Sequence, residues 1–150
     1  MVREVSYADL PSLAGEEVGV SEWLTISQDR VNQFADATGD HQWIHVDVPR
    51  ATKEIGGPIA HGYLTLSLIP YFASQILRVT GVSRGINYGS NKVRFTNMVR
   101  VGKRVRMREK LVSVEPKSGG LQMIAECTIE IEGEDRPACV AETVSVLYGA

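Results

Sequence analysis

The spacing of apolar and polar residues changes once along the chain, near Gly81. Before that point the spacing is helical: Val31, Phe34, Ala35 and Thr38 stand at i, i+3, i+4 and i+7 and form one packing stripe. After it, apolar and polar residues alternate, which is typical of strands. The pattern predicts an α+β protein whose helices come before most of its sheet.

Local signals set the limits of two helices in the first half. Ser27 is a good N-cap for the first, and Gly39 is expected to end it. A second, short helix is predicted over 47–55. Residues 1–21 show no period and are expected to form an irregular lead-in arm, with a short strand at 22–26.

Residues 62–80 predict a long helix that is apolar on nearly every side, with a kink at Pro70. A helix of this kind is normally surrounded by other elements, so we expect it at the centre of the core. The stretch 58–79 could also be tested as a membrane span, but it contains His61 and Arg78. A buried helix in a soluble, cytoplasmic protein is the favoured interpretation, with no membrane partner.

Four long strands are predicted after the helix, at 84–96, 102–115, 121–132 and 137–148. Long antiparallel strands with a single apolar helix before them suggest a sheet wrapped around that helix. No repeat or linker divides the 150 residues, so one domain over 1–150 is expected.

Charge narrows the function classes. The formal net charge is −2, which argues against a general nucleic-acid binder. Eight of the sixteen basic residues fall within 92–110, which could form a phosphate-binding face. Folding 102–115 onto 121–132 instead gives cross-strand ion pairs, and this structural interpretation is favoured. The pairs are Arg104 with Glu132, Arg106 with Glu130 and Lys110 with Glu126. Lys92 and Arg94 lack such partners and remain candidates for binding a charged substrate tail.

The two cysteines, Cys127 and Cys139, lie in separate predicted strands and lack the spacing of a metal or redox motif. We expect both to be small buried residues with free thiols rather than nucleophiles or a disulfide.

Asp40 and His45 are the main candidates for chemistry. They lie five residues apart in a predicted loop between two helices, where both side chains can face one cleft. A carboxylate and an imidazole that share one water can remove one proton and deliver another, as the addition of water to an activated double bond requires. A helix cap plus a packed histidine is the alternative.

Gly62 begins the long predicted helix and adds a second half to the candidate site. A helix N-terminus presents free N–H groups, and glycine lets a ligand approach the backbone closely. A carbonyl oxygen bound there would be polarised. The neighbouring His61 either contacts substrate or is satisfied by backbone. A metal site that includes His41 is disfavoured, because adjacent residues such as Asp40 and His41 point apart.

These residues resemble a known family. The motif Phe34-Ala35-x-x-Thr38-Gly39-Asp40-x-x-x-x-His45, followed by Ile59-Ala60-His61-Gly62, is similar to the MaoC-like dehydratases, which include R-specific enoyl-CoA hydratases. The branch with nodulation protein N is the most similar, over about residues 20–148. The resemblance implies a hotdog fold, with an antiparallel sheet around a long central helix, and a homodimer with the substrate tunnel at its interface.

The resemblance also implies roles for individual residues. Asp40 and His45 would be the acid/base pair, and the Gly62 N–H would receive the carbonyl of a CoA thioester. The implied reaction is the reversible hydration of a trans-2-enoyl-CoA to the R-3-hydroxyacyl-CoA, with no metal or redox cofactor. The commonest form of the motif has Asn-Pro where this chain has Gln42 and Trp43. The Gln42 amide is expected to orient His45 or the substrate.

Two other functions remain open at this stage. A hotdog thioesterase would use the carboxylate and water to hydrolyse the thioester, and a non-catalytic subunit would only bind acyl-CoA. The histidine five residues after the acid favours hydration, because hydrolysis needs no proton donor to carbon.

Overall fold

The computed structural model describes residues 2–150. The helices are η1 (Leu10–Leu13), α1 (Gln28–Thr38), α2 (Trp43–Val46), α3 (Val48–Ile55), α4 (Gly62–Ser67) and α5 (Ile69–Ile76). The strands are β1 (Arg3–Ser6), β2 (Glu17–Val20), β3 (Leu24–Thr25), β4 (Leu77–Thr80), β5 (Val82–Arg94), β6 (Arg104–Lys117), β7 (Gly120–Ile131) and β8 (Cys139–Gly149). Within the described residues, none of the helices is both long enough and apolar enough to span a bilayer.

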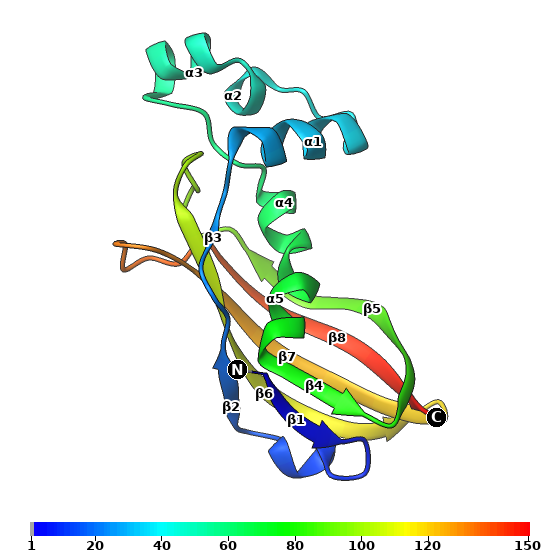
Figure 1. Ribbon diagram of the computed structural model, residues 1–150. Helices are drawn as coiled ribbons and strands as arrows, with labels where there is room; N and C mark the ends of the chain where they lie inside the picture. The colour runs from blue at the N-terminus through cyan, green and yellow to red at the C-terminus, as the bar shows by residue number, and fades with distance from the viewer. Residues whose placement is uncertain (1) are drawn as a thin grey trace.

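The main sheet is antiparallel and has the strand order β2-β6-β7-β8-β5, with β3 also paired to β6. In Figure 1, α4 and α5 follow one another along this sheet, and α1, α2 and α3 gather beyond its end, near the start of α4. A curved antiparallel sheet that packs on one central helical segment is the hotdog arrangement. The predicted α+β hotdog fold is therefore confirmed.

The core lies between α5 and the sheet. Phe72 and Ile76 of α5 are fully or almost fully buried, as are Met107, Leu111 and Ile129 of the facing strands. A fully buried side chain of this size contributes on the order of 1.5–3 kcal/mol. The core therefore holds the central helical segment in a fixed position on the sheet.

The long helix predicted over 62–80 is wrong in its continuity and its end. It is interrupted at Leu68, α5 ends at Ile76, and the last four residues of the range form β4 instead. Pro70 explains the interruption, because it lacks an N–H and fits only the first turn of α5. The helix is also not covered on all sides: Tyr63 and Tyr71 are 69% and 48% exposed.

The lead-in region is more ordered than the sequence predicts. β1 pairs in parallel with β4, and β2 pairs with β6. Leu10 and Leu13 of η1 are buried in the core. The expectation of an irregular arm over 1–21 is wrong, because its short strands depend on partners about 75 and 90 residues further along the chain. The loop expected at 40–46 likewise contains the short helix α2.

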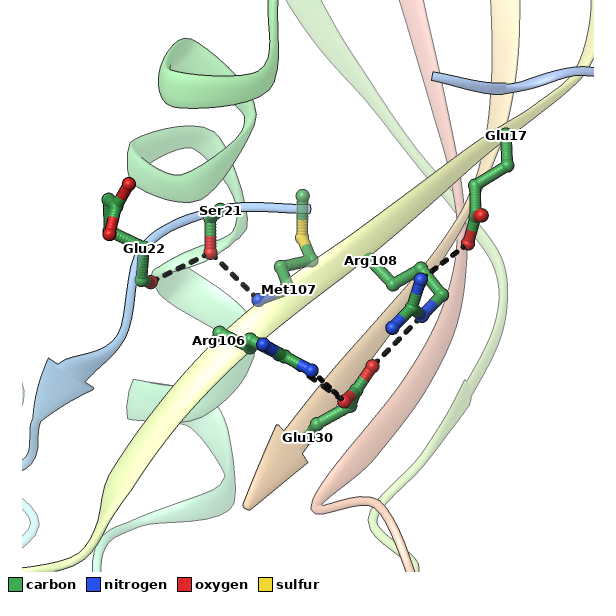
Figure 2. Close-up of polar contacts among 7 residues, drawn as sticks. All are labelled: Glu17, Ser21, Glu22, Arg106, Met107, Arg108 and Glu130. Carbon is green, nitrogen blue, oxygen red and sulfur yellow. Dashed lines mark hydrogen bonds and ion pairs between the residues drawn. The ribbon is translucent and has the colours of Figure 1, made fainter. Parts of the chain in front are cut away.

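The basic stretch of β6 makes two of the three cross-strand ion pairs that the sequence predicts, and the third pair of residues is opposite in register without an ion pair. Figure 2 shows Arg106 and Arg108 both pairing with Glu130, while Arg108 also reaches Glu17 of β2. Arg104 pairs with Glu132, and Lys110 stands opposite Glu126 in the register. These partly exposed pairs are worth at most about 1 kcal/mol each. The structural interpretation of this stretch is confirmed.

A buried hydroxyl connects β6 to the chain after β2. Ser21 Oγ accepts a hydrogen bond from the Met107 N–H at 2.9 Å and donates one to the Glu22 carbonyl at 3.0 Å (Figure 2). This contact satisfies a backbone N–H of β6 where the edge pairing passes from β2 to β3.

Candidate active site

Asp40 is placed by the end of α1. Ser27 caps the start of this helix, since its side chain accepts a hydrogen bond from the Arg30 N–H. Gly39 ends the helix at a φ of 84°, a left-handed conformation that glycine adopts without strain. The following Asp40 is exposed, and its carboxylate accepts a hydrogen bond from the Gln42 N–H at 3.3 Å. The predicted caps of α1 are both confirmed.

His45 is buried, and its surroundings fix its tautomer. Its Nδ1 lies 2.6 Å from the Ile59 carbonyl oxygen, which can only accept, so Nδ1 carries the proton and Nε2 has a free lone pair. Burial lowers the pKa of His45, and this effect outweighs the opposing bond to Ile59. The imidazole is therefore neutral near pH 7 and can accept a proton at Nε2.

His61 is buried next to His45 and has one ring nitrogen without a partner. Its Nε2 donates to the Asp40 carbonyl oxygen at 3.0 Å, while its Nδ1 has no hydrogen-bond partner among residues 2–150. Its ring stacks on His45 at 3.8 Å between centroids, and Phe34 lies 4.9 Å away. The backbone therefore satisfies Nε2 of His61, which is one of the two alternatives that the sequence leaves open for this residue. Its Nδ1 has no partner among residues 2–150.

The three side chains Asp40, His45 and His61 come together. One ligand atom from each, a carboxylate oxygen and two ring nitrogens, lies within 4.8 Å of the others. This set can hold a water, and its atom types would also suit a divalent metal. The rings of His45 and His61 are nearly parallel, at 24°. That the site works without a metal stays a prediction. His41 is exposed and pairs with Asp36 instead.

A cavity of about 400 Å³ opens beside this group. Its lining includes His45, Gly62, Thr65, Phe95, Asn97 and Arg136. Gly62 is the first residue of α4, and the His61 side chain makes no capping bond to that first turn. A Cβ at Gly62 would lie 3.2 Å from the Phe95 ring. Glycine therefore lets the Phe95 ring pack close to the helix start, where both residues line the cavity.

The predicted site residues do not all meet. Gln42 is exposed and contributes its backbone N–H to Asp40, whereas the side chain that binds the His45 carbonyl is Gln28, at 2.8 Å. A contact of the Gln42 amide with substrate stays a prediction. The sequence does not predict Gln28 and Ile59 as partners of His45. They lie 17 and 14 residues away from it, and nothing in their local sequence marks such a contact.

Comparison with known proteins identifies the family of this chain. Residues 9–131 match the family model described as a MaoC like domain. The chain is 54% identical to 3-hydroxyacyl-thioester dehydratase Z of Mycobacterium tuberculosis, over 93% of each chain. It is 44% identical to nodulation protein N of Rhizobium leguminosarum bv. viciae, over 97% of this chain and 93% of that protein.

Solved structures support the fold independently of sequence identity. The R-hydratase PhaJ1 of Pseudomonas aeruginosa superposes with a TM-score of 0.76, at 21% identity, over 96% of this chain and 86% of that one. The family match covers most of the chain and includes every predicted site residue. The chain therefore belongs to the MaoC-like dehydratase family, and with it to the hydro-lyases.

Proposed function

We propose that the protein is an R-specific enoyl-CoA hydratase, which adds water reversibly to a trans-2-enoyl-CoA and yields the R-3-hydroxyacyl-CoA. The observation that carries this proposal is the meeting of the Asp40 carboxylate and the neutral, oriented His45 beside a cavity that begins at Gly62. The names of two relatives, a 3-hydroxyacyl-thioester dehydratase and an R-hydratase, support the same reaction class.

The chemistry needs a water, a base, an acid and a place for negative charge. A water held between Asp40 and His45 loses a proton to this pair as its oxygen bonds to C3 of the enoyl group. The electrons of the double bond move toward the thioester carbonyl, whose oxygen is held at the Gly62 N–H. The pair then returns a proton to C2, which completes the addition, and the reverse order of events is dehydration.

No redox step occurs in this reaction, and the thioester itself activates the double bond, so the proposal needs neither a metal nor a redox cofactor. His45 has the tautomer for its part, because Ile59 holds the proton at Nδ1 and leaves Nε2 to accept one. His61 stacks on His45 and bonds the Asp40 backbone, so it positions both members of the pair.

We also propose that the enzyme is a homodimer. β5 is the last strand of the sheet, and Ile86 and Tyr88 of this strand are 49% and 71% exposed. Tyr63 and Tyr71 add exposed apolar surface on the central helical segment. A long edge strand with exposed apolar side chains is normally covered, and a twofold axis beside β5 would cover both copies. Light scattering of the purified protein tests this assignment.

The test of the reaction follows the loss of the enoyl-thioester absorbance of crotonyl-CoA. Asp40→Asn and His45→Gln should each lower kcat by about 10²–10⁴-fold, the typical contribution of a general acid or base. His41→Gln is the matched control, because this histidine is exposed and bonds Asp36. Hydration by both site variants at the wild-type rate would refute the proposal.

Two further readings separate the alternatives. Release of free thiol without loss of the double bond would assign the protein as a thioesterase. Unchanged hydration after treatment with a chelator is expected, and loss of activity that a divalent cation restores would contradict a metal-free mechanism.

A further inference from the structure

Glu109 is a buried acid that the proposed reaction does not use. It lies in the middle of β6 on the same face of the strand as the core residues Met107 and Leu111, and it is 4% exposed. No hydrogen bond or ion pair joins its carboxyl group to another of residues 2–150, and burial alone raises its pKa to about 7. A largely buried carboxyl group is costly without a hydrogen bond, so its partner comes from outside the chain, as water or as a ligand in the cavities that Glu109 lines.

Glu109 lines two neighbouring cavities, and the larger one opens to the surface beside β5, the edge strand that the proposed homodimer would cover. The larger, of about 540 Å³, lies between the central helical segment and strands β5, β7 and β8. The smaller has a volume of about 240 Å³, and Glu109, Ala73 and Met123 line both cavities. The larger cavity has apolar walls together with several hydroxyl and amide groups, from Ser67, Asn87, Ser90, Thr143 and Ser145.

These cavities lie further along the helix whose start holds the candidate site. Thr65 lines the cavity of the candidate site, and the next residue, Leu66, lines the larger of the two cavities that Glu109 lines. Ala73, beside Glu109, comes 11 residues after Gly62. It belongs to α5, which follows α4 along the sheet after the interruption at Leu68 (Figure 1). An acyl chain that extends from Gly62 along the helix would bring its distal part to Glu109.

The chemistry of Glu109 selects among possible chains. A plain alkyl chain would fill the space and leave the carboxyl group unpaired. An ammonium group would hold the carboxyl group in its ionised form, at the cost of desolvating two charges, and a ketone would accept a hydrogen bond only from the neutral form. A hydroxyl group donates to a carboxylate and accepts from a carboxylic acid, so it serves Glu109 in either state. The other hydroxyl and amide groups of the cavity can bond the same oxygen.

We propose that Glu109 is a specificity-determining residue that selects acyl thioesters with a hydroxyl group on the distal part of the chain. The proposal rests on the hydratase function and adds to it the class of acyl chain. A wholly unsubstituted acyl chain is then the poorer substrate.

The experiment compares matched pairs of trans-2-enoyl-CoA thioesters over a series of chain lengths. The two members of a pair differ only in a terminal hydroxyl or a terminal methyl group. The quantity measured is the ratio of kcat/KM for the hydroxyl substrate to kcat/KM for the methyl substrate, taken within one variant. At the length that reaches Glu109, the wild type should favour the hydroxyl substrate by about 10-fold.

Two substitutions at Glu109 separate hydrogen bonding from shape. Glu109→Gln keeps a donor and an acceptor and should retain part of the preference. Glu109→Leu removes both and should reverse it in favour of the methyl substrate. Glu115→Gln is the control, because Glu115 lies on the same strand but is exposed, and its ratio should equal that of the wild type.

The outcomes distinguish this inference from the proposed function. A wild type that favours the methyl substrate at every length, or a Glu109→Leu variant that keeps the wild-type ratio, would overturn the role of Glu109. If even crotonyl-CoA is not hydrated, the proposed function fails instead. Calorimetric Kd values for the same pairs would then decide the inference: tighter binding of the hydroxyl member supports it, and equal binding overturns it.

Discussion

Removing the ionisable group of Glu109 should change how stability depends on pH. In the folded protein the pKa of this carboxyl is about 7 because of burial, whereas its ordinary value is 4.5. Glu109→Gln keeps nearly the same shape and cannot ionise. The difference in free energy of unfolding between wild type and variant therefore isolates this one group.

The sign and the size follow from proton binding. Between about pH 4.5 and about pH 7 the folded protein keeps a proton that the unfolded chain has released, so the stability of the wild type falls as pH rises. Each tenfold difference in proton affinity is worth about 1.4 kcal/mol, so the full effect is about 3 kcal/mol. Below about pH 4.5 the carboxyl group makes no difference to the free energy of unfolding, and above about pH 7 the loss of stability is constant.

Urea unfolding at a series of pH values, at one protein concentration and without ligand, measures this effect. The wild type should lose about 3 kcal/mol relative to Glu109→Gln across the range. The neighbouring thiol of Cys127 has a pKa of about 12 and stays neutral throughout. Glu115→Gln, on the exposed part of the same strand, should show no such difference. A difference between wild type and Glu109→Gln that does not vary with pH would refute the reasoning.

Three further predictions concern the site and its support. Gly62→Ala places a Cβ 3.2 Å from the Phe95 ring. This variant should lower kcat/KM for crotonyl-CoA by up to about 10²-fold while the melting temperature changes little. Wild-type kinetics would show that no close approach is needed at this position. On the acid side, kcat/KM should fall only below pH 6.5, because the reaction needs neutral His45 and burial lowers the pKa of this residue. An acid-side fall in kcat/KM that begins above pH 6.5 would contradict this assignment. Ser21→Ala leaves the buried Met107 N–H without its acceptor. The free energy of unfolding in urea titrations should therefore fall by about 1–3 kcal/mol. A loss within about 0.5 kcal/mol would mean that water replaces the hydroxyl.

Much of the fold follows from local patterns. Ser27 and Gly39 mark the limits of α1 because capping involves atoms only a few residues apart. The alternation after Gly81 predicts all four long strands, and the opposite charges of β6 and β7 predict their register. Asp40 and His45 can be paired as candidates from the sequence because their spacing belongs to a motif in one continuous stretch, and their roles stay a prediction.

Other features depend on residues that are distant in the sequence. β1 becomes a strand because β4 offers it a partner, and β4 leaves the helical pattern because Leu77 takes an extended conformation beside Arg3. His61 stacks on His45 because the chain returns to the same place after α3. No local pattern encodes these contacts, since they depend on how the elements pack.

The environment of Glu109 depends both on the local sequence pattern and on tertiary packing. The sequence alternation of β6 places this acid on the same face as Met107 and Leu111, which was a usable signal for a core position. The packing of the helix on the sheet alone decides that this acid has no partner among residues 2–150 and lines a cavity beside α5. Backbone hydrogen bonding and side-chain alternation are local and can be read along the chain. Burial, the pKa values it changes and the cavities it leaves depend on several elements packed together.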